Sequence, residues 1–383
     1  MTDAPKTVVI LGTGATIGSR YKHCGENLPG DQGFFGNRVV QALLKDGNFH
    51  ALNIMLGTFR KMYGESLANA SLEEVWTFLE FSAIDLYKPL TDLTEQRSKW
   101  LEKIRKPESR TDDEHCLCQH YRENRAIPPQ TEIDLHLLAG WDLRRLLCQV
   151  YGEVSAPSDG NIYGSLITKF KMVEDSNTTF ISLNYDTILE QALTHAELPW
   201  HYLHVQTGES RKESGIRILK PHGSFNWLFK GNEPPASIST DYRLTPVTHW
   251  SFTVNRFEEA MIIPPTQLKQ AINMSKTQLP ETTALLSSIW RSMTDALVDA
   301  SRVFVIGYSF PSTDHHLRTL FHQVRHTRDR QQTKEYDEVY CCTLANGGQE
   351  GLVFENANRF FPAKSFHPHD RGFEDFVRKA PSG

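Results

Sequence analysis

Several features of other protein classes are missing from this sequence of 383 residues. The six cysteines are scattered and include no C-x-x-C pair, so neither a disulfide framework nor a paired-cysteine metal module is expected. No apolar stretch approaches the ~20 residues that a membrane span needs, and the apolar run near the N-terminus is too short for the core of a signal peptide. A net charge of −5 gives no basic field typical of nucleic-acid-binding proteins. We therefore expect a cytoplasmic protein that binds neither membranes nor nucleic acid directly.

Short apolar runs rich in β-branched residues indicate buried parallel strands. The first run, Thr7–Leu11, leads into a glycine loop and then a probable helix, which is the opening of a nucleotide-binding α/β unit. We expect further strands of the same sheet at residues 179–183, 261–263, 302–306 and 339–344. The sequence thus predicts an α/β fold with a Rossmann-like parallel sheet.

Residues 41–170 show a helical pattern instead. Apolar residues share one face of each of two predicted helices. We therefore expect a mainly helical insertion at 41–170, carried by a Rossmann-like core of residues 1–40 and 171–383, with another amphipathic helix at 282–300. The residues of the two faces are Val75, Phe78, Leu79, Ser82 and Leu86 in one, and Leu135, Leu138, Leu146, Leu147 and Val150 in the other.

The glycine loop after the first strand suits a phosphate group. Gly12 and Gly14 lack a Cβ, so the backbone can approach a pyrophosphate, and the following helix directs its N–H groups to the same place. A dinucleotide dehydrogenase would also need an acidic residue at the end of the second strand. Asp31 lies at a suitable distance, but in a glycine-rich segment, which argues against hydride transfer. Such a loop taken alone can also be merely a tight turn.

Polar residues follow three other strands. Asn184 and Asp186 stand at the carboxyl end of a predicted strand, where both side chains can reach one pocket or can simply cap a helix. His222 lies between a short strand and a glycine, so it can act as a base near pH 7 or serve as a structural loop residue. Gly307 and Ser309 follow a further strand and suit contacts with a phosphate or ribose.

In this order, the Gly-x-Gly, Asn-x-Asp, His-Gly and Gly-x-Ser elements resemble the sirtuin family over nearly the whole chain. Four variants look like the branch found in bacterial antiphage-defence proteins, whose members typically degrade NAD⁺. These variants are Leu-Asn-Tyr-Asp at 183–186, Lys-Pro-His-Gly-Ser at 220–224, Ile-Ile-Pro-Pro-Thr at 262–266 and Ile-Gly-Tyr-Ser-Phe-Pro at 306–311.

The resemblance implies a role for each matching position, with NAD⁺ as the substrate. Residues 29–34 resemble the loop that closes over the nicotinamide side. The other implied roles are a phosphate loop at Gly12, Gly14 and Thr16, a ribose and nicotinamide pocket at Asn184 and Asp186, a catalytic histidine at His222, a second phosphate contact at Gly307 and Ser309, and an adenosine contact at Asn346.

Two departures favour NAD⁺ hydrolysis with release of nicotinamide over deacylation of lysine. The C-x-x-C pairs that bind structural zinc in deacetylase sirtuins are absent, and Leu183 stands where those enzymes usually have glutamine. A metal at His115, Cys116, Cys118 and His120 is disfavoured, because this spacing is poor for four tetrahedral ligands. Two alternatives stay open: a protein deacylase or ADP-ribosyltransferase, and a non-catalytic module that senses NAD⁺ or ADP-ribose. Linear and cyclic ADP-ribose products are not distinguished.

The resemblance also bears on partners. Defence proteins of this branch that carry sensor domains are much longer than this chain, so we expect the activity to be gated by self-association, a partner or a ligand. The apolar faces of residues 41–170 are the expected contact surface. The expected assembly is a homo-oligomer, with a HerA-type ATPase as partner, acting in antiphage defence by NAD⁺ depletion.

We expect the purified protein to contain no zinc and to release no acetyl group from acetyl-lysine peptides in the presence of NAD⁺. The missing C-x-x-C pairs and Leu183 are the reasons. Elemental analysis and an acetyl-release assay check the two halves separately. One zinc per chain contradicts the first half, and NAD⁺-dependent release of acetyl contradicts the second.

Overall fold

The main sheet of the protein consists of seven parallel strands in the order β12-β11-β10-β1-β5-β7-β6. The structure is a computed structural model, which describes residues 6–46, 49–64, 66–85, 132–152, 154–157, 160–172, 178–202, 215–230, 258–262, 280–344, 348 and 350–379. The strands are β1 (Thr7–Leu11), β5 (Thr178–Ser182), β6 (Trp200–Tyr202), β7 (Ile216–Leu219), β10 (Arg302–Ile306), β11 (Tyr336–Cys342) and β12 (Ala363–His369).

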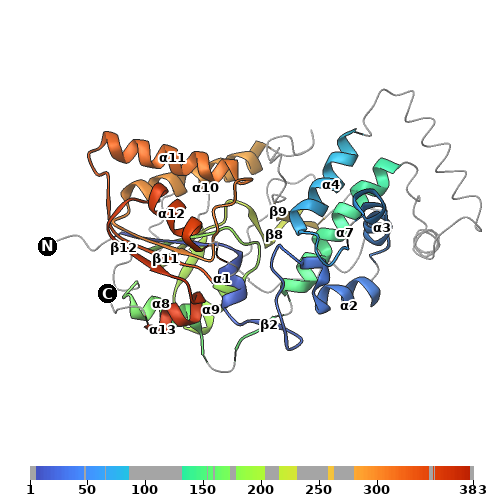
Figure 1. Cartoon of the computed structure of the whole chain (residues 1–383), viewed down its shortest axis with the longest axis horizontal. Coiled ribbons are helices and arrows are strands. Elements are labelled where there is room, and N and C mark those ends of the chain that lie inside the picture. Colours follow the sequence, from blue (N-terminus) through green and yellow to red (C-terminus); the bar gives the residue numbers. More distant parts are fainter. Residues whose placement is uncertain are drawn as a thin grey trace, which may run out of the picture.

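Helices cover both faces of this sheet, which explains why its central strands are buried along their whole length (Figure 1). All residues of β1, β5 and β10 are buried, as expected for strands that contact helices on two sides. The predicted Rossmann-like α/β fold is confirmed. One face carries α10 (Pro280–Asp299), α11 (His315–Arg330) and α12 (Glu350–Phe360), and the other carries α1 (Thr13–Gly18), α8 (Ile162–Lys169), α9 (Ile188–His195) and α13 (Gly372–Lys379).

The strand order reverses between β1 and β10. The chain passes from β1 to its neighbour β5 on one side, whereas from β10 it passes to β11 on the other side. Connections that leave two adjacent strands in opposite directions open a crevice at their carboxyl ends, where ligands of such sheets bind. The sheet therefore places the loops that begin at Gly12 and Gly307 at its switch point.

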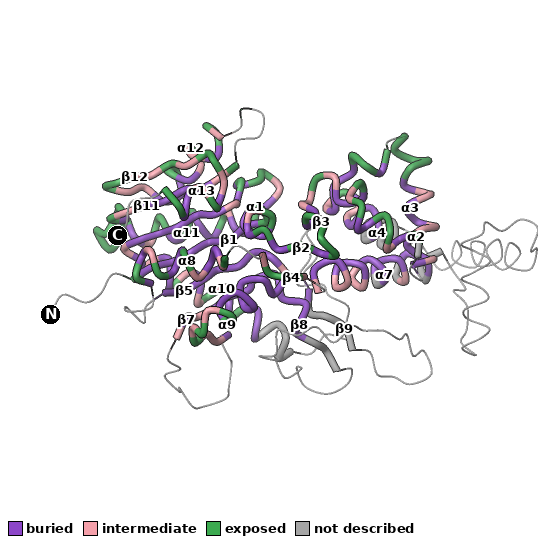
Figure 2. Tube along the Cα trace, turned by 90° about the horizontal axis from the view of Figure 1, so that it is seen from below, coloured by how far each residue is buried: buried purple, intermediate pink, exposed green. Residues whose placement is uncertain are grey.

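A second group of helices lies beside the sheet (Figures 1 and 2). It consists of α2 (Arg38–Asp46), α3 (His50–Tyr63), α4 (Leu72–Asp85) and α7 (Glu132–Gly152), and α7 packs against the other three. The helix α8, which also falls within 41–170, packs instead on α9 and α13 below the sheet. The domain boundaries themselves stay a prediction.

Most of the predicted apolar faces of these helices are buried. In α4 the buried members are Val75, Phe78 and Leu79. In α7 they are Leu135, Leu146, Leu147 and Val150, with Leu138 partly buried. Leu86 lies outside the described residues.

The prediction that residues 261–263 belong to the main sheet was wrong. They overlap the end of β9 (Glu258–Ile262), which pairs antiparallel with β8 (Gly223–Lys230) in a separate sheet of two strands. An apolar run shows that a strand is buried but not which strand it pairs with. The edge strands β6 and β12 were not predicted, because β6 has three residues and β12 is largely polar.

The remaining elements are short. A small antiparallel sheet joins β2 (Lys22–His23) to β3 (Glu26–Asn27) and β4 (Val154–Ser155), and a 3-10 helix, η1, spans Phe34–Gly36. In the part of the chain that the structure describes, no helix has the length and apolar character needed to cross a bilayer.

Asp142 of α7 provides a test of this helical group. Its Oδ2 accepts a hydrogen bond from the Leu52 backbone N–H at 3.2 Å, and its Oδ1 lies 3.1 Å from the Arg145 guanidinium. Burial nevertheless raises the pKa of Asp142 from 3.8 to about 6. The folded state therefore keeps this proton to a higher pH than the unfolded chain does.

We expect ionisation of Asp142 to destabilise the fold as the pH rises from about 4 to about 6. Between these values the folded state binds more protons than the unfolded state, so the free energy of unfolding falls, by about 3 kcal/mol for two pKa units. Asp142→Asn keeps an oxygen for the Leu52 N–H and removes the titration. Urea unfolding of both proteins across this range measures the difference, and parallel pH profiles would contradict it.

Candidate functional site

Four polar or glycine-rich segments meet at the carboxyl edge of the main sheet. They comprise residues 12–16 after β1, 183–186 after β5, 220–224 after β7 and 307–309 after β10. The central strands end level, because Leu11 pairs with Ser182 on one side and with Ile306 on the other. The sheet register therefore brings together segments that are far apart in sequence, as Gly12 and Gly307 are.

The two glycine loops touch each other through their backbones. The Gly14 N–H donates to the Gly307 carbonyl at 3.0 Å, and a Cβ on Gly12 would lie 2.5 Å from the same oxygen. Gly307 has a φ of 65°, and a Cβ there would lie 2.2 Å from the Ala15 nitrogen. Glycine is thus required here for the close contact between the two segments.

Side chains from α1 and from the loop after β5 form a buried hydrogen-bonded cluster. The Thr16 hydroxyl donates to Asp186 Oδ2 at 2.6 Å and accepts from Asn184 Nδ2 at 2.9 Å. Asn184 Nδ2 also donates to the Gly12 carbonyl at 2.9 Å. The structure therefore brings together Thr16, Asn184 and Asp186, which the sequence analysis assigned to one pocket. Both of these bonds use the side-chain nitrogen of Asn184, so its Oδ1 is the atom that can accept from a ligand.

Asp186 also has a structural contact. Its Oδ1 accepts from the Ile188 N–H at 3.0 Å, at the start of α9, as the alternative capping role predicted. Burial raises the pKa of Asp186, while the nearby Lys220 ammonium and the Thr16 hydroxyl oppose this shift. The carboxylate thus holds α9 and the first two loops together.

His222 is buried, and its ring is oriented by the backbone of the loop after β5. Its Nδ1 lies 3.2 Å from the Leu183 carbonyl, which can only accept, so in the neutral ring the proton is on Nδ1 and the lone pair is on Nε2. The aromatic rings of Tyr185 and Trp290 lie beside the imidazole, with ring centroids at 6.2 and 6.5 Å. This geometry suits a general base held by the backbone of Leu183, the residue before Asn184.

A buried charged network under these loops was not singled out from the sequence. Lys220 is fully buried and donates to the Asp186 carbonyl and to Glu190 Oε1, the latter at 3.1 Å. Glu190 also accepts from the Tyr202 hydroxyl at 2.7 Å, and the Asn226 amide donates to that same hydroxyl at 3.1 Å. The signal was present, since Lys220 adjoins the His-Gly motif, but a lysine in a loop is normally exposed.

The segment 29–34 lies over the first turns of α1. A Cβ on Gly30 would lie 3.0 Å from the side chain of Ile17 and 4.0 Å from that of Thr13. The carboxylate of Asp31 accepts from the Glu73 N–H at 3.1 Å, at the start of α4. The predicted loop is thus close to the glycine loop and fastened to the helical group.

The remaining predicted residues have different outcomes. Ser309 is exposed at the switch point, next to Gly307. Asn346 lies outside the described residues, as do His115, Cys116, Cys118 and His120. Among the residues that the structure describes, no group of histidine, cysteine and acidic side chains is arranged to hold a metal ion.

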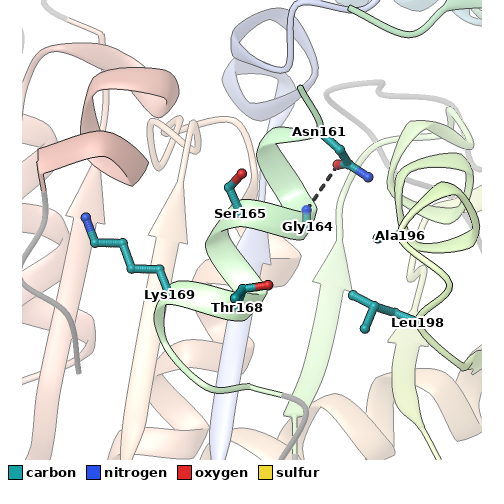
Figure 3. A pocket seen from close by; sticks show the side chains of 7 residues that line it. All are labelled: Asn161, Gly164, Ser165, Thr168, Lys169, Ala196 and Leu198. Atoms are coloured by element: carbon teal, nitrogen blue, oxygen red, sulfur yellow. Dashed lines mark hydrogen bonds between the residues drawn. The ribbon is translucent and has the colours of Figure 1, made fainter. Parts of the chain in front are cut away.

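An open pocket of about 560 Å³ lies elsewhere, along α8 and the end of α9 (Figure 3). Its lining includes Asn161, which accepts from the Gly164 N–H, and Lys169. None of the predicted site residues lines this pocket, so it is separate from the cluster at the sheet edge.

Comparisons with known proteins find similarity to SIR2-like proteins. Residues 178–341 match the model of the SIR2-like domain, a family of NAD-consuming enzymes. They include five of the predicted site residues: Asn184, Asp186, His222, Gly307 and Ser309. Similar solved structures include a Sir2 homologue mutant in complex with ADP-ribose, with 10% identity, a TM-score of 0.33 and coverage of 62% of this chain and 72% of that one. A Sir2 homologue–NAD complex has 10% identity, a TM-score of 0.32 and coverage of 74% and 80%. No curated protein matches.

We expect Lys220→Met to destabilise the fold by about 3–5 kcal/mol, because it leaves the buried Glu190 carboxylate without its cation. The double variant Lys220→Met/Glu190→Gln should recover part of this loss, since glutamine is neutral and keeps an oxygen for the Tyr202 hydroxyl. Chemical denaturation of the three proteins gives the free energies of unfolding. Equal stability of the single and double variants would show that the loss does not come from a Glu190 carboxylate left without its cation.

Proposed function

We propose that the protein hydrolyses NAD⁺ at the bond between nicotinamide and ribose C1′. The observation that carries the proposal is the convergence of Asn184, Asp186 and the oriented imidazole of His222 at the carboxyl edge of the sheet. The SIR2-like match supports it, because it connects the same segments with NAD-related activity.

The reaction needs one water molecule and one base. Nicotinamide leaves as a neutral group, so the C1′–N bond breaks through an oxocarbenium-like transition state, as in glycoside cleavage. The water oxygen bonds to C1′, and the Nε2 lone pair of His222 takes the released proton. The products are ADP-ribose, nicotinamide and a proton that His222 returns to solvent.

Asn184 and Asp186 would fix the geometry of this step. The Asn184 amide nitrogen is held by Gly12 and Thr16, which directs Oδ1 toward a ribose hydroxyl or the attacking water. Asp186 is held by Thr16 and Ile188 and would form the nicotinamide side of the pocket. Groups that are already held in place need little reorganisation when charge develops in the transition state.

The diphosphate would lie at the switch point. The joined loops around Gly12, Gly14 and Gly307 present backbone with no side chain between them, and Ser309 adds an exposed hydroxyl. Asn346 would contact the adenosine half, as the family resemblance implies.

The wider biological role rests on the sequence motifs alone. We propose antiphage defence by NAD⁺ depletion, a homo-oligomeric assembly and a HerA-type ATPase partner, all from the resemblance of the four motif variants. A hydrolase that depletes a central metabolite has to be restrained, which is the physical reason to expect control by assembly.

We expect His222→Ala and Asn184→Ala each to lower the rate of nicotinamide release by at least about 100-fold, the usual contribution of a positioned base or orienting group. His326→Ala, on the outer side of α11, is the matched control and should keep full activity. Nicotinamide release by purified protein, with and without an acetylated peptide, measures the effect, and thermal unfolding confirms the fold of each variant.

Unchanged release in both folded variants would contradict the assignment. Release that requires the peptide would favour the deacylase or transferase alternative. Binding of NAD⁺ without any release by the wild-type protein would favour the sensing module.

A further inference from the structure

Tyr151 connects the helical group to the site. It lies in the last turn of α7, and its hydroxyl donates to the Pro29 carbonyl at 2.9 Å. Its ring stacks on Phe225, with centroids 6.0 Å apart and planes at 16°. The Phe225 N–H in turn donates to the Tyr185 carbonyl at 3.0 Å, in the loop between Asn184 and Asp186. One buried side chain thus contacts both the segment 29–34 and the strand that follows His222.

The electrostatic surroundings of Tyr151 agree with this position. Burial raises the pKa of its hydroxyl, and the carboxylates of Asp186 and Asp31 raise it further. The phenol is therefore close enough to Asp186 in the proposed nicotinamide pocket, and to Asp31 in the segment 29–34, to interact with their charges. It stays protonated. A protonated phenol can keep donating its hydrogen bond to Pro29.

Other contacts fasten the segment between α1 and α2 to the same helix end. The Val150 carbonyl lies 3.1 Å from His23 Nδ1, and β4, just after α7, pairs with β2. These contacts hold residues 22–23, whereas the Tyr151 hydroxyl contacts the part that lies over α1, which Asp31 also joins to α4. Removing that hydroxyl therefore acts on a limited part of the segment.

We propose that Tyr151 is a positioning residue for NAD⁺, because its hydroxyl helps to hold the segment 29–34 in place over the phosphate loop. The inference deepens the proposed function and rests on it. Since α7 belongs to the helical group, the closure of the site depends on that group as well as on the sheet.

The expected kinetic consequence is a change in KM rather than in kcat. A loop that is already held in place loses less conformational entropy when the substrate binds. This advantage applies equally to bound substrate and transition state, so its loss weakens uniform binding. One net hydrogen bond corresponds to about a fivefold change in an equilibrium constant.

Tyr151→Phe is the test, because phenylalanine keeps the ring that stacks on Phe225 and removes the bond to Pro29. Tyr336→Phe is the matched control: Tyr336 is also buried, and its hydroxyl also donates to a backbone carbonyl, that of Leu297, at 3.0 Å. Both variants lose one comparable hydrogen bond, but only the first bond is next to the site.

The first measurement is hydrogen exchange of residues 28–36 in the protein without NAD⁺. We expect exchange about fivefold faster in Tyr151→Phe than in wild type and no change in Tyr336→Phe. The second is the kinetics of nicotinamide release, where the KM for NAD⁺ should rise about fivefold in Tyr151→Phe with kcat within about twofold.

The two measurements separate the inference from the proposed function. Unchanged exchange in Tyr151→Phe overturns the positioning role, whatever the enzyme does. Equal changes of KM in Tyr151→Phe and Tyr336→Phe also overturn it, because the effect would then come from general destabilisation. Faster exchange in Tyr151→Phe together with no release of nicotinamide by the wild-type protein contradicts the proposed hydrolase and leaves the loop contact supported.

Discussion

The hydroxyl group of Thr16 joins α1 to both polar side chains of the loop after β5. It donates to the Asp186 carboxylate and accepts from the Asn184 amide, and both bonds are inside the protein. A hydroxyl can do both because it carries one hydrogen and two lone pairs. Without it, a buried amide and a buried carboxylate would each lose a partner, at a cost of about 1–3 kcal/mol per group. The orientation of both residues used by the proposed reaction depends on this contact.

A buried ion pair supports the same loops from below. Two charges that leave water lose the free energy of their hydration. Their mutual attraction offsets this cost only when further hydrogen bonds are made by both groups. Lys220 donates such a bond to the Asp186 carbonyl, and Glu190 accepts one from the Tyr202 hydroxyl. A pair of apolar residues could fill this space, but it would leave the Asp186 carbonyl without the ammonium group. The charged pair therefore fixes the position of the loop in addition to filling the core.

The sequence predicted the parts of the fold that depend on local pattern. The strands β1 and β10 were predicted with their observed ends, because both are short, apolar and followed by glycine. Pairing is not a local property, so residues 261–263 were placed in the wrong sheet. The glycines were predicted as a phosphate loop, whereas the contact between Gly12 and Gly307 depends on two segments that meet only in the folded chain.

Residues that support the site were missed for the same reason. Tyr151 lies 35 positions before Asp186 and is one of several buried apolar or aromatic residues at the end of α7, so its pattern indicates only a helix face. What distinguishes it is the position of its hydroxyl, next to Pro29 and within the field of two carboxylates. The polar tip of an aromatic residue needs a partner when it is buried, and that partner is chosen by tertiary packing.

These contacts relate the helical group to the chemistry at the sheet edge. The sheet alone can hold Asn184, His222 and the glycine loops, because all of them follow its strands. The segment 29–34 is different, because hydrogen bonds join it to the helical group. Asp31 accepts one from Glu73 of α4, and Pro29 accepts one from Tyr151 of α7. A shift of these two helices relative to the sheet would therefore act on the segment over α1 through both hydrogen bonds, and on the sheet edge through the contact of Tyr151 with Phe225.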